Sequence, residues 1–149
     1  MTDETVAAGP EGSTVRVVIA DDQRVVRAGL RALLEVDPSI RVLGEADDGR
    51  QAIDLVATTR PDVILMDIRM PGLDGLQATQ RIRDAHPEVQ VIILTTFGLD
   101  EYVFTAVRAG AAGFLLKDGD ADDLIRAVHV AARGDALMSP EALRTLLDE

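Results

Sequence analysis

The chain contains no cysteine and no tryptophan, and aromatic residues make up only 3% of its 149 residues. Without cysteine there are no disulfides and no thiol chemistry, which is compatible with a cytoplasmic protein. No uninterrupted apolar run exceeds four residues, so the sequence predicts neither a transmembrane helix nor a secretory signal. Aliphatic side chains must therefore fill the core, and 47% hydrophobic residues are enough for one domain.

Positive charge is also scarce. The net charge of −11 argues against a nucleic-acid-binding surface in this chain. Of the 15 basic residues all but one are arginine, and Lys117 is the single lysine. Chance within an arginine-rich composition is one explanation. The position of Lys117, directly after an apolar run, favours a selected ammonium group.

Four short apolar runs each stop on a polar residue that suits phosphate chemistry. Such runs, separated by longer amphipathic stretches, are typical of buried parallel strands. The polar residues are Asp21-Asp22, Asp67, Thr95-Thr96 and Lys117. Ligand sites of open parallel sheets lie at the carboxyl ends of the strands. We therefore expect three carboxylates, a hydroxyl and an ammonium to converge on one edge of the sheet.

Alternating strand and helix segments predict an α/β fold, a doubly wound five-stranded parallel sheet of order 2-1-3-4-5 with helices on both faces. The expected strands are Val15–Ala20, Ile40–Ala46, a third ending at Met66, Val89–Leu94 and Gly113–Leu116. The expected helices are about Gln23–Val36, Gln51–Thr59, Leu76–Ala85, Asp100–Ala109 and Asp120–Arg133. Residues 1–14 are predicted to be a disordered tail, and 135–149 a linker with a short helix.

The acidic edge predicts a site for a hard cation. Three neighbouring carboxylates repel one another unless such a cation lies among them, and Mg²⁺ (or Mn²⁺) suits carboxylate and phosphate ligands. An aspartate can then attack a phosphoryl group and become an acyl phosphate. Lys117 would supply a charge, Thr95 a hydroxyl, and the loop after Asp67 backbone N–H groups for the phosphoryl oxygens. The alternative is a set of solvated acids at strand ends.

Four motifs resemble the receiver domain of bacterial two-component response regulators, over about residues 15–134. They are Ala20-Asp21-Asp22, the segment from Leu65 to Gly75, Leu94-Thr95-Thr96, and the segment from Gly113 to Asp118. Within that family the chain resembles the NarL/FixJ (LuxR-type) branch. The features are the segment from Asp21 to Leu30, Lys117-Asp118 where many receivers have Lys-Pro, and the segment from Gly134 to Pro140.

The resemblance implies a flavodoxin-like receiver fold and a role for each residue of the acidic edge. Asp67 is identified as the phosphoacceptor. Asp22 would bind Mg²⁺ directly, Asp21 mostly through water, and the backbone carbonyl of Arg69 would complete the protein ligands.

The resemblance also implies switch and lifetime residues. Thr95 would move toward the phosphoryl group, and Phe114 would be the aromatic coupled to it. Many relatives have tyrosine at that position, and Phe114 cannot donate a hydroxyl hydrogen bond. Large side chains at Arg69 and Phe97 would hinder the attacking water and so lengthen the phosphoryl lifetime.

The function implied by the resemblance is a cytoplasmic signalling switch rather than an enzyme with a separate substrate. It would take its phosphoryl group from a cognate sensor histidine kinase, in a reaction that it catalyses with Mg²⁺, and hydrolyse the product slowly. Phosphorylation would favour a homodimer. Transcription would be controlled through a helix-turn-helix domain that this chain lacks, so we expect no DNA binding by these residues alone and no membrane binding.

Two other functions stay open at this stage. A phosphatase of the haloacid-dehalogenase type also uses a strand-end aspartate and Mg²⁺, but it needs an acid two residues later, where this chain has Arg69. A pseudo-receiver scaffold would not need the complete set of polar residues found here. A P-loop enzyme is unsupported, since no Gly-x-x-x-x-Gly-Lys-[Ser/Thr] motif occurs.

Two further features have an ordinary interpretation. Arg24, Arg27 and Arg31 form a basic stripe at helical spacing, which predicts a solvated face, with a docking surface for a kinase helix as the alternative. His86 and His129 are predicted to be structural or exposed, because no carboxylate frame accompanies either of them in the sequence.

Overall fold

A computed structural model describes residues 14–95, 105–117, 119–134 and 137–138. They form one parallel sheet in the order β2-β1-β3-β4-β5-β6. The strands are β1 (Val15–Ala20), β2 (Ile40–Ala46), β3 (Val63–Asp67), β4 (Gln90–Thr95), β5 (Gly113–Leu116) and β6 (Leu137–Met138). The predicted order 2-1-3-4-5 is confirmed. The sequence did not predict β6, which pairs with the outer edge of β5.

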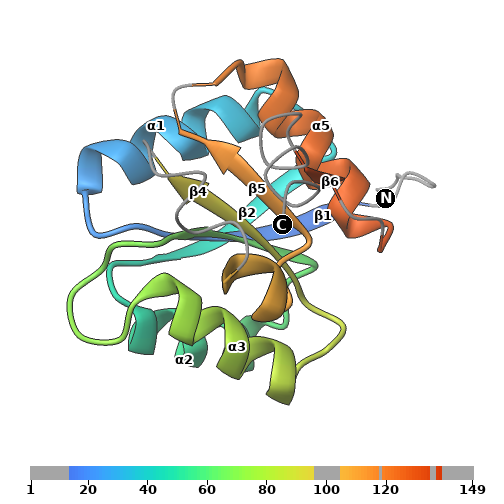
Figure 1. Cartoon of the computed structure of the whole chain (residues 1–149). Coiled ribbons are helices and arrows are strands. Elements are labelled where there is room, and N and C mark those ends of the chain that lie inside the picture. Colours follow the sequence, from blue (N-terminus) through green and yellow to red (C-terminus); the bar gives the residue numbers. More distant parts are fainter. Residues whose placement is uncertain (1–13, 96–104, 118, 135–136, 139–149) are drawn as a thin grey trace, which may run out of the picture.

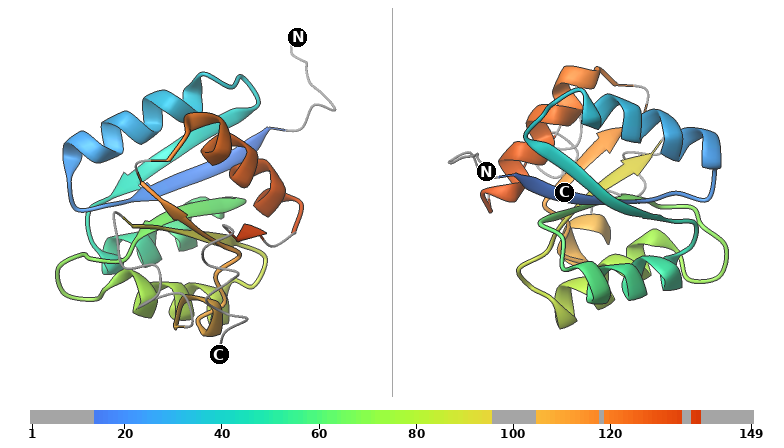
Figure 2. Two further views of the ribbon diagram at one scale, coloured as in Figure 1. Left: turned by 45° about the horizontal axis from the view of Figure 1, so that its top comes forward. Right: turned by 180° about the vertical axis from the view of Figure 1, so that it is seen from behind.

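Helices cover both faces of the sheet, as predicted. They are α1 (Arg24–Glu35), α2 (Gly49–Thr59), α3 (Gly75–Ala85) and α5 (Ala121–Ala132). Figure 1 shows α1 and α5 on one face and α2 and α3 on the other, and Figure 2 shows the same layers from two further directions. Residues 105–108 are helical, whereas the first part of the expected fourth helix and the expected helix after Ser139 lie outside the described residues.

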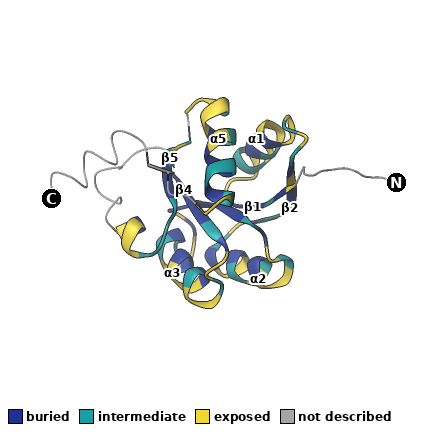
Figure 3. Cartoon of the chain, turned by 90° about the vertical axis from the view of Figure 1, so that its right-hand side faces the viewer, coloured by how far each residue is buried: buried dark blue, intermediate teal, exposed yellow. Residues whose placement is uncertain are grey.

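The core has two layers because successive side chains of a buried strand point to opposite faces. In β1, Val17 and Ile19 pack with the cluster that includes Leu34 of α1. Val18 and Ala20 pack instead with the cluster on the α2 and α3 side. Figure 3 shows the result, a buried sheet between helices whose outer faces are exposed. Both faces being buried explains why the strands are continuous apolar runs.

A polar cluster joins the turn before β2 to α5. Nε2 of His129 lies 2.9 Å from Asp37 Oδ2 and 3.3 Å from Ser39 Oγ. Hydrogen bonds from Ser39 and the contact with His129 lower the pKa of Asp37 to about 2. A serine–histidine–aspartate relay needs both ring nitrogens, but here one nitrogen meets both partners. The cluster is therefore a cross-link between elements. His129 has the structural role that was one of the two predicted for it, but the premise was wrong, since the carboxylate of Asp37 does accompany it.

The described residues include no helix with the length and apolar character needed to cross a membrane.

At Gly75 the start of α3 packs closely against the end of β3, and this close packing allows a first prediction. A Cβ at this position would collide with the backbone carbonyl oxygen of Asp67. We expect Gly75→Ala to lower the free energy of unfolding by about 1–3 kcal/mol, as overpacking does. Gly29→Ala is the matched control, since Gly29 is an exposed residue of α1 with open space around it. That change should instead stabilise by about 0.5–1 kcal/mol. Urea unfolding of both variants measures the difference, and equal midpoints would contradict the prediction.

Candidate functional site

The register of the sheet brings the acidic residues to one edge. Ala20 of β1 pairs with Met66 of β3, so the residues that follow them, Asp21 and Asp67, become neighbours. Asp67 is the last residue of β3 and Asp22 continues the chain from Asp21. One carboxylate oxygen from each of Asp21, Asp22 and Asp67 lies within 4.8 Å of the others. The predicted convergence of three carboxylates is therefore found in the structure.

Lys117 closes the cluster from the other side. It follows β5, and its backbone N–H donates to the carbonyl of Thr95 at 2.7 Å. Its Nζ lies 2.6 Å from Asp21 Oδ2 and 3.3 Å from Asp67 Oδ2. Since only 13% of the Lys117 side chain is exposed, this ammonium is held between two carboxylates rather than in solvent. The single lysine of the chain thus belongs to the site.

Burial and neighbouring charges shift the pKa values of Asp67 and Lys117. Asp67 is buried, and burial together with the charge of Asp21 raises its pKa, although Lys117 and a backbone hydrogen bond from Arg69 oppose the rise. Burial alone would lower the pKa of Lys117, but the hydrogen bonds and charges of Asp21 and Asp67 outweigh burial and raise it. One ammonium therefore does not fully compensate the carboxylates.

The donor set fits a hard divalent cation. Asp21 Oδ2 is buried and, apart from its ion pair with Lys117, has no hydrogen-bond partner among the described residues. Asp22 is exposed and lines an open groove of about 520 Å³ together with the loop after β3. Oxygen ligands that are partly buried, partly open to water and short of positive charge suit Mg²⁺ or Mn²⁺.

The loop after β3 is shaped by its own residues. Gly72 has φ +73°, which a glycine adopts without strain. Asp74 is the N-cap of α3 and forms a capping box. Its carboxylate accepts from the Gln77 backbone N–H at 2.8 Å, and the Gln77 side-chain oxygen accepts from the Asp74 backbone N–H at 3.2 Å. The loop therefore enters the helix at a fixed angle. This places Arg69, which is exposed, along the groove beside Asp22.

The remaining predicted residues are not all at the cluster itself. Thr95 is the last residue of β4 and is buried, and the strand position before it, Leu94, pairs with Asp67. Phe114 is fully buried in the core on the α2 and α3 side and pairs with Ile93, so its ring points inward here. Phe97 lies outside the described residues.

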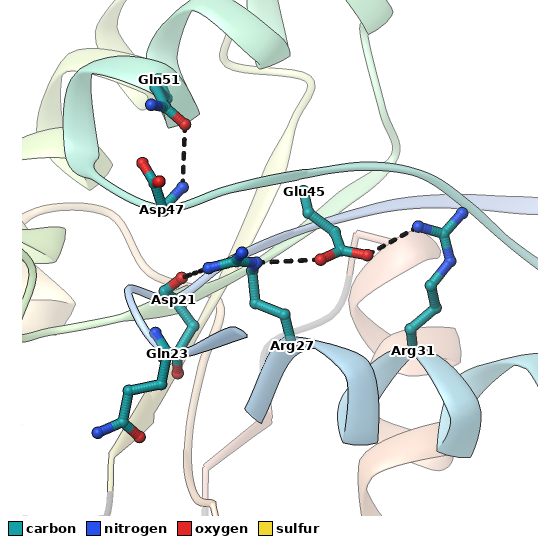
Figure 4. Close-up of polar contacts among 7 residues, drawn as sticks. All are labelled: Asp21, Gln23, Arg27, Arg31, Glu45, Asp47 and Gln51. Carbon is teal, nitrogen blue, oxygen red and sulfur yellow. Dashed lines mark hydrogen bonds and ion pairs between the residues drawn. The ribbon is translucent and has the colours of Figure 1, made fainter. Parts of the chain in front are cut away.

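Sequence reasoning missed one group that touches the site. Figure 4 shows Arg27 of α1 between Asp21 and Glu45 of β2, with Arg31 on the far side of Glu45. The prediction of a solvated basic stripe is therefore wrong for Arg27, whose side chain is only 13% exposed. It failed because helical spacing places arginines on one face without revealing which strand residue that face meets.

Comparisons with known proteins give one consistent family. The family model described as "Response regulator receiver domain" matches residues 17–129. The chain is 44% identical to the uncharacterized transcriptional regulatory protein YxjL of Bacillus subtilis over 135 aligned residues. The alignment covers 91% of this chain and 62% of that protein. Over 131 residues it is 37% identical to the nitrate/nitrite response regulator protein NarL of Escherichia coli, covering 88% and 60%. The chain thus spans less than two thirds of these curated relatives.

Solved structures agree with the sequence relatives. A two-component response regulator of the LuxR family from Aurantimonas sp. SI85-9A1 superimposes with a TM-score of 0.85 at 33% identity, over 91% of this chain and 97% of that one. The signal receiver domain of a Mycobacterium tuberculosis response regulator assigned as NarL gives a TM-score of 0.78 at 39% identity, over 82% and 98%. None of these matches supports the phosphatase or the pseudo-receiver.

Proposed function

Because the chain belongs to the response regulator receiver domains of two-component systems, in their NarL/LuxR-type branch, we propose that it is a cytoplasmic switch phosphorylated on Asp67. One observation carries the proposal. Asp67 ends β3 beside two other aspartates, and the single lysine of the chain lies 3.3 Å from its carboxylate. An attacking carboxylate, a cation site and a compact positive charge are what phosphoryl transfer to an aspartate requires.

The transfer itself exchanges one bond for another. A carboxylate oxygen of Asp67 bonds to phosphorus while the P–N bond to a kinase phosphohistidine breaks, and the imidazole leaves with the electron pair. The ammonium of Lys117 faces oxygens of the transferred group, and the backbone N–H groups after Asp67 donate to others. Attack by water on phosphorus later releases inorganic phosphate and restores the carboxylate. Slow hydrolysis makes the chain a switch rather than a phosphatase.

The metal would bind residues that lie near one another at the acidic edge. Asp21, Asp22, Asp67 and the backbone carbonyl of Arg69 would hold Mg²⁺ or Mn²⁺. When bound, this ion would neutralise the carboxylates and attract the phosphoryl oxygens. The raised pKa of Asp67 supports this assignment, because it is a sign that Lys117 does not fully compensate the negative charge of the cluster.

The receiver family also implies switch residues, and their positions here are compatible with that role. Thr95 is buried at the end of β4, one strand from Asp67, and would move toward the phosphoryl group. The buried ring of Phe114, which packs in the same cluster as Ala106, would respond by repacking, which would alter the face formed by the fourth helix, β5 and α5. Arg69 and Phe97 would set the phosphoryl lifetime by hindering water, and the exposure of Arg69 on the groove supports its part in this.

We also propose an output outside these residues. The curated relatives include transcriptional regulators of which the chain covers about three fifths. The whole protein would then receive its phosphoryl group from a sensor histidine kinase, form a homodimer and contact DNA through a helix-turn-helix domain. In this arrangement residues 15–134 are the receiver domain, and residues 135–149 are a linker that leads toward the DNA-binding domain.

Phosphoryl transfer can be tested directly on the 149-residue chain. We expect incubation with acetyl phosphate and Mg²⁺ to add one phosphoryl group, detected by intact mass spectrometry. Chelation of the metal with EDTA before the donor is added should prevent the gain. A chain that remains unmodified with saturating donor and Mg²⁺, while retaining its folded circular dichroism spectrum, would refute the proposed function.

A further inference from the structure

Arg27 connects α1 to the backbone of the acidic edge. Its Nη1 donates to the backbone carbonyl oxygen of Asp21 at 2.6 Å, and its Nε donates to Glu45 Oε1 at 3.0 Å (Figure 4). The guanidinium group is planar and rigid, so two partners in different directions fix both its position and its orientation. The Arg27 side chain is mostly buried, unlike an ordinary surface ion pair.

Glu45 has a second partner on α1. Arg31 Nη1 lies 2.8 Å from its second carboxylate oxygen. The hydrogen bond from Arg31 is the largest cause that lowers the pKa of Glu45, and the one from Arg27 adds to it. The carboxylate therefore stays charged at neutral pH and anchors Arg27 from β2. The other partner of Arg31 is Glu35 within α1, so neither of its contacts is with the acidic edge.

The carbonyl that Arg27 contacts belongs to the peptide bond between Asp21 and Asp22. Asp21 has further restraints, since its backbone N–H donates to Ala46 at 3.0 Å and its Oδ1 accepts from the Gln23 N–H at 2.8 Å. Asp22 is exposed, so core packing does not orient its carboxylate. The hydrogen bond from Arg27 fixes the plane of the peptide bond before Asp22. It can therefore orient the Asp22 side chain while both carboxylate oxygens of Asp22 stay available to a cation.

We propose that Arg27, anchored by Glu45, is a positioning residue that holds Asp21 and Asp22 in the geometry that binds a divalent cation. The inference rests on the proposed function, since it concerns the cation site that function requires. Residues that orient metal ligands from behind commonly change metal affinity by 10–100-fold when they are replaced. An ion pair with only a local structural role would leave that affinity unchanged.

Arg27→Met and Arg31→Met form a matched pair of variants. Both remove a guanidinium from the same helix and a partner from the same glutamate, and both keep an unbranched side chain that suits a helix. Only Arg27→Met removes the contact with the Asp21 carbonyl. Glu45 keeps one arginine in either variant, so neither leaves a carboxylate without a partner.

The readout is Mn²⁺ affinity, measured from the electron paramagnetic resonance signal of free Mn²⁺ without any phosphoryl donor. We expect Arg27→Met to bind Mn²⁺ about tenfold more weakly, at the lower end of the range for such residues. Arg31→Met should stay within about twofold of the unmodified chain, a difference that the loss of a more distant charge accounts for. Thermal unfolding in EDTA shows whether both variants remain folded.

Two results would overturn the inference: wild-type Mn²⁺ affinity in Arg27→Met, or an equal loss in Arg31→Met. If Arg27→Met does not fold, Glu45→Gln decides in its place, with weaker Mn²⁺ binding supporting the inference and unchanged binding overturning it. The proposed function fails separately, through the absence of phosphoryl uptake by the unmodified chain. A chain that takes up phosphate, with an Arg27→Met variant that binds Mn²⁺ normally, would refute only the positioning role.

Discussion

Phosphoryl uptake is expected to disappear when Asp67 is replaced by asparagine, while the fold becomes no less stable. The amide cannot form the acyl phosphate, so intact mass spectrometry after incubation with acetyl phosphate and Mg²⁺ should show no added group. Asp84→Asn, at an exposed position of α3, is the control and should be phosphorylated normally. Persistent modification of Asp67→Asn would place the phosphoacceptor elsewhere.

The stability of Asp67→Asn follows from the direction of the pKa shift. Because burial and the charge of Asp21 raise the pKa of Asp67, its ionised form is disfavoured in the folded state. This penalty is present at neutral pH and disappears as the pH falls below the pKa of the unfolded chain. We therefore expect Asp67→Asn to unfold at an equal or higher urea concentration at pH 7 in EDTA, with the difference vanishing in acid.

Replacing Lys117 with methionine is expected to damage both stability and chemistry. Removal of one partner from a buried ion pair costs about 3–5 kcal/mol, because it leaves uncompensated charge. Loss of a group that stabilises the transferred phosphoryl oxygens slows such reactions by about 10²–10³-fold. Urea unfolding and the initial rate of phosphoryl uptake measure the two effects. Added Mg²⁺ should recover part of the stability, since it supplies the missing positive charge.

Two variants sharpen the test of Lys117. Lys117→Arg keeps the charge, but a planar guanidinium does not fit where a compact ammonium meets two carboxylates, so the phosphorylation response should still be impaired. Arg126→Met is the control, because its ion pair with Asp123 is exposed and should contribute less than about 1 kcal/mol. Normal uptake and response by Lys117→Arg would show that the single lysine is an accident of composition.

The acidic edge was predictable because it depends on one general rule. In a parallel sheet the carboxyl ends of the strands share an edge, so a polar residue that follows an apolar run is expected to lie at that edge. The structure places there Asp21, Asp67 and Lys117, and the Lys117 ammonium lies within 3.3 Å of both carboxylates. No knowledge of side-chain packing was needed.

Element boundaries were less predictable, because they depend on local hydrogen bonds. Helix α2 begins at Gly49, two residues before its predicted start, since the carboxylate of Asp48 accepts from the Gln51 N–H at 2.8 Å. Apolar periodicity marks where a helix becomes amphipathic, whereas the cap marks where it begins. Asp48 was a readable signal that periodicity alone did not use.

The Arg27–Glu45 pair was not predictable, because it depends on an irregularity in the sheet. Val17 pairs with Val42, but Val18 pairs with Gly44, so β2 contains one extra residue at this point. A shift of one residue moves every later side chain to the other face of a strand. This irregularity turns Glu45 toward α1. Strict alternation from Val42 would have directed it toward α2 and α3.

The short strand β6 affects how readily the edge of the sheet at β5 opens to solvent. Among the described residues, Leu137 and Met138 are the ones that pair with the outer edge of β5, where they lie opposite Gly113 and Phe114. Short elements with few backbone hydrogen bonds open at a small cost in free energy, ahead of the rest of the fold. Amide protons along this edge should therefore exchange with solvent sooner than those of β3 and β4. The backbone that carries Phe114 is thus expected to open at a lower cost in free energy than the central strands β3 and β4.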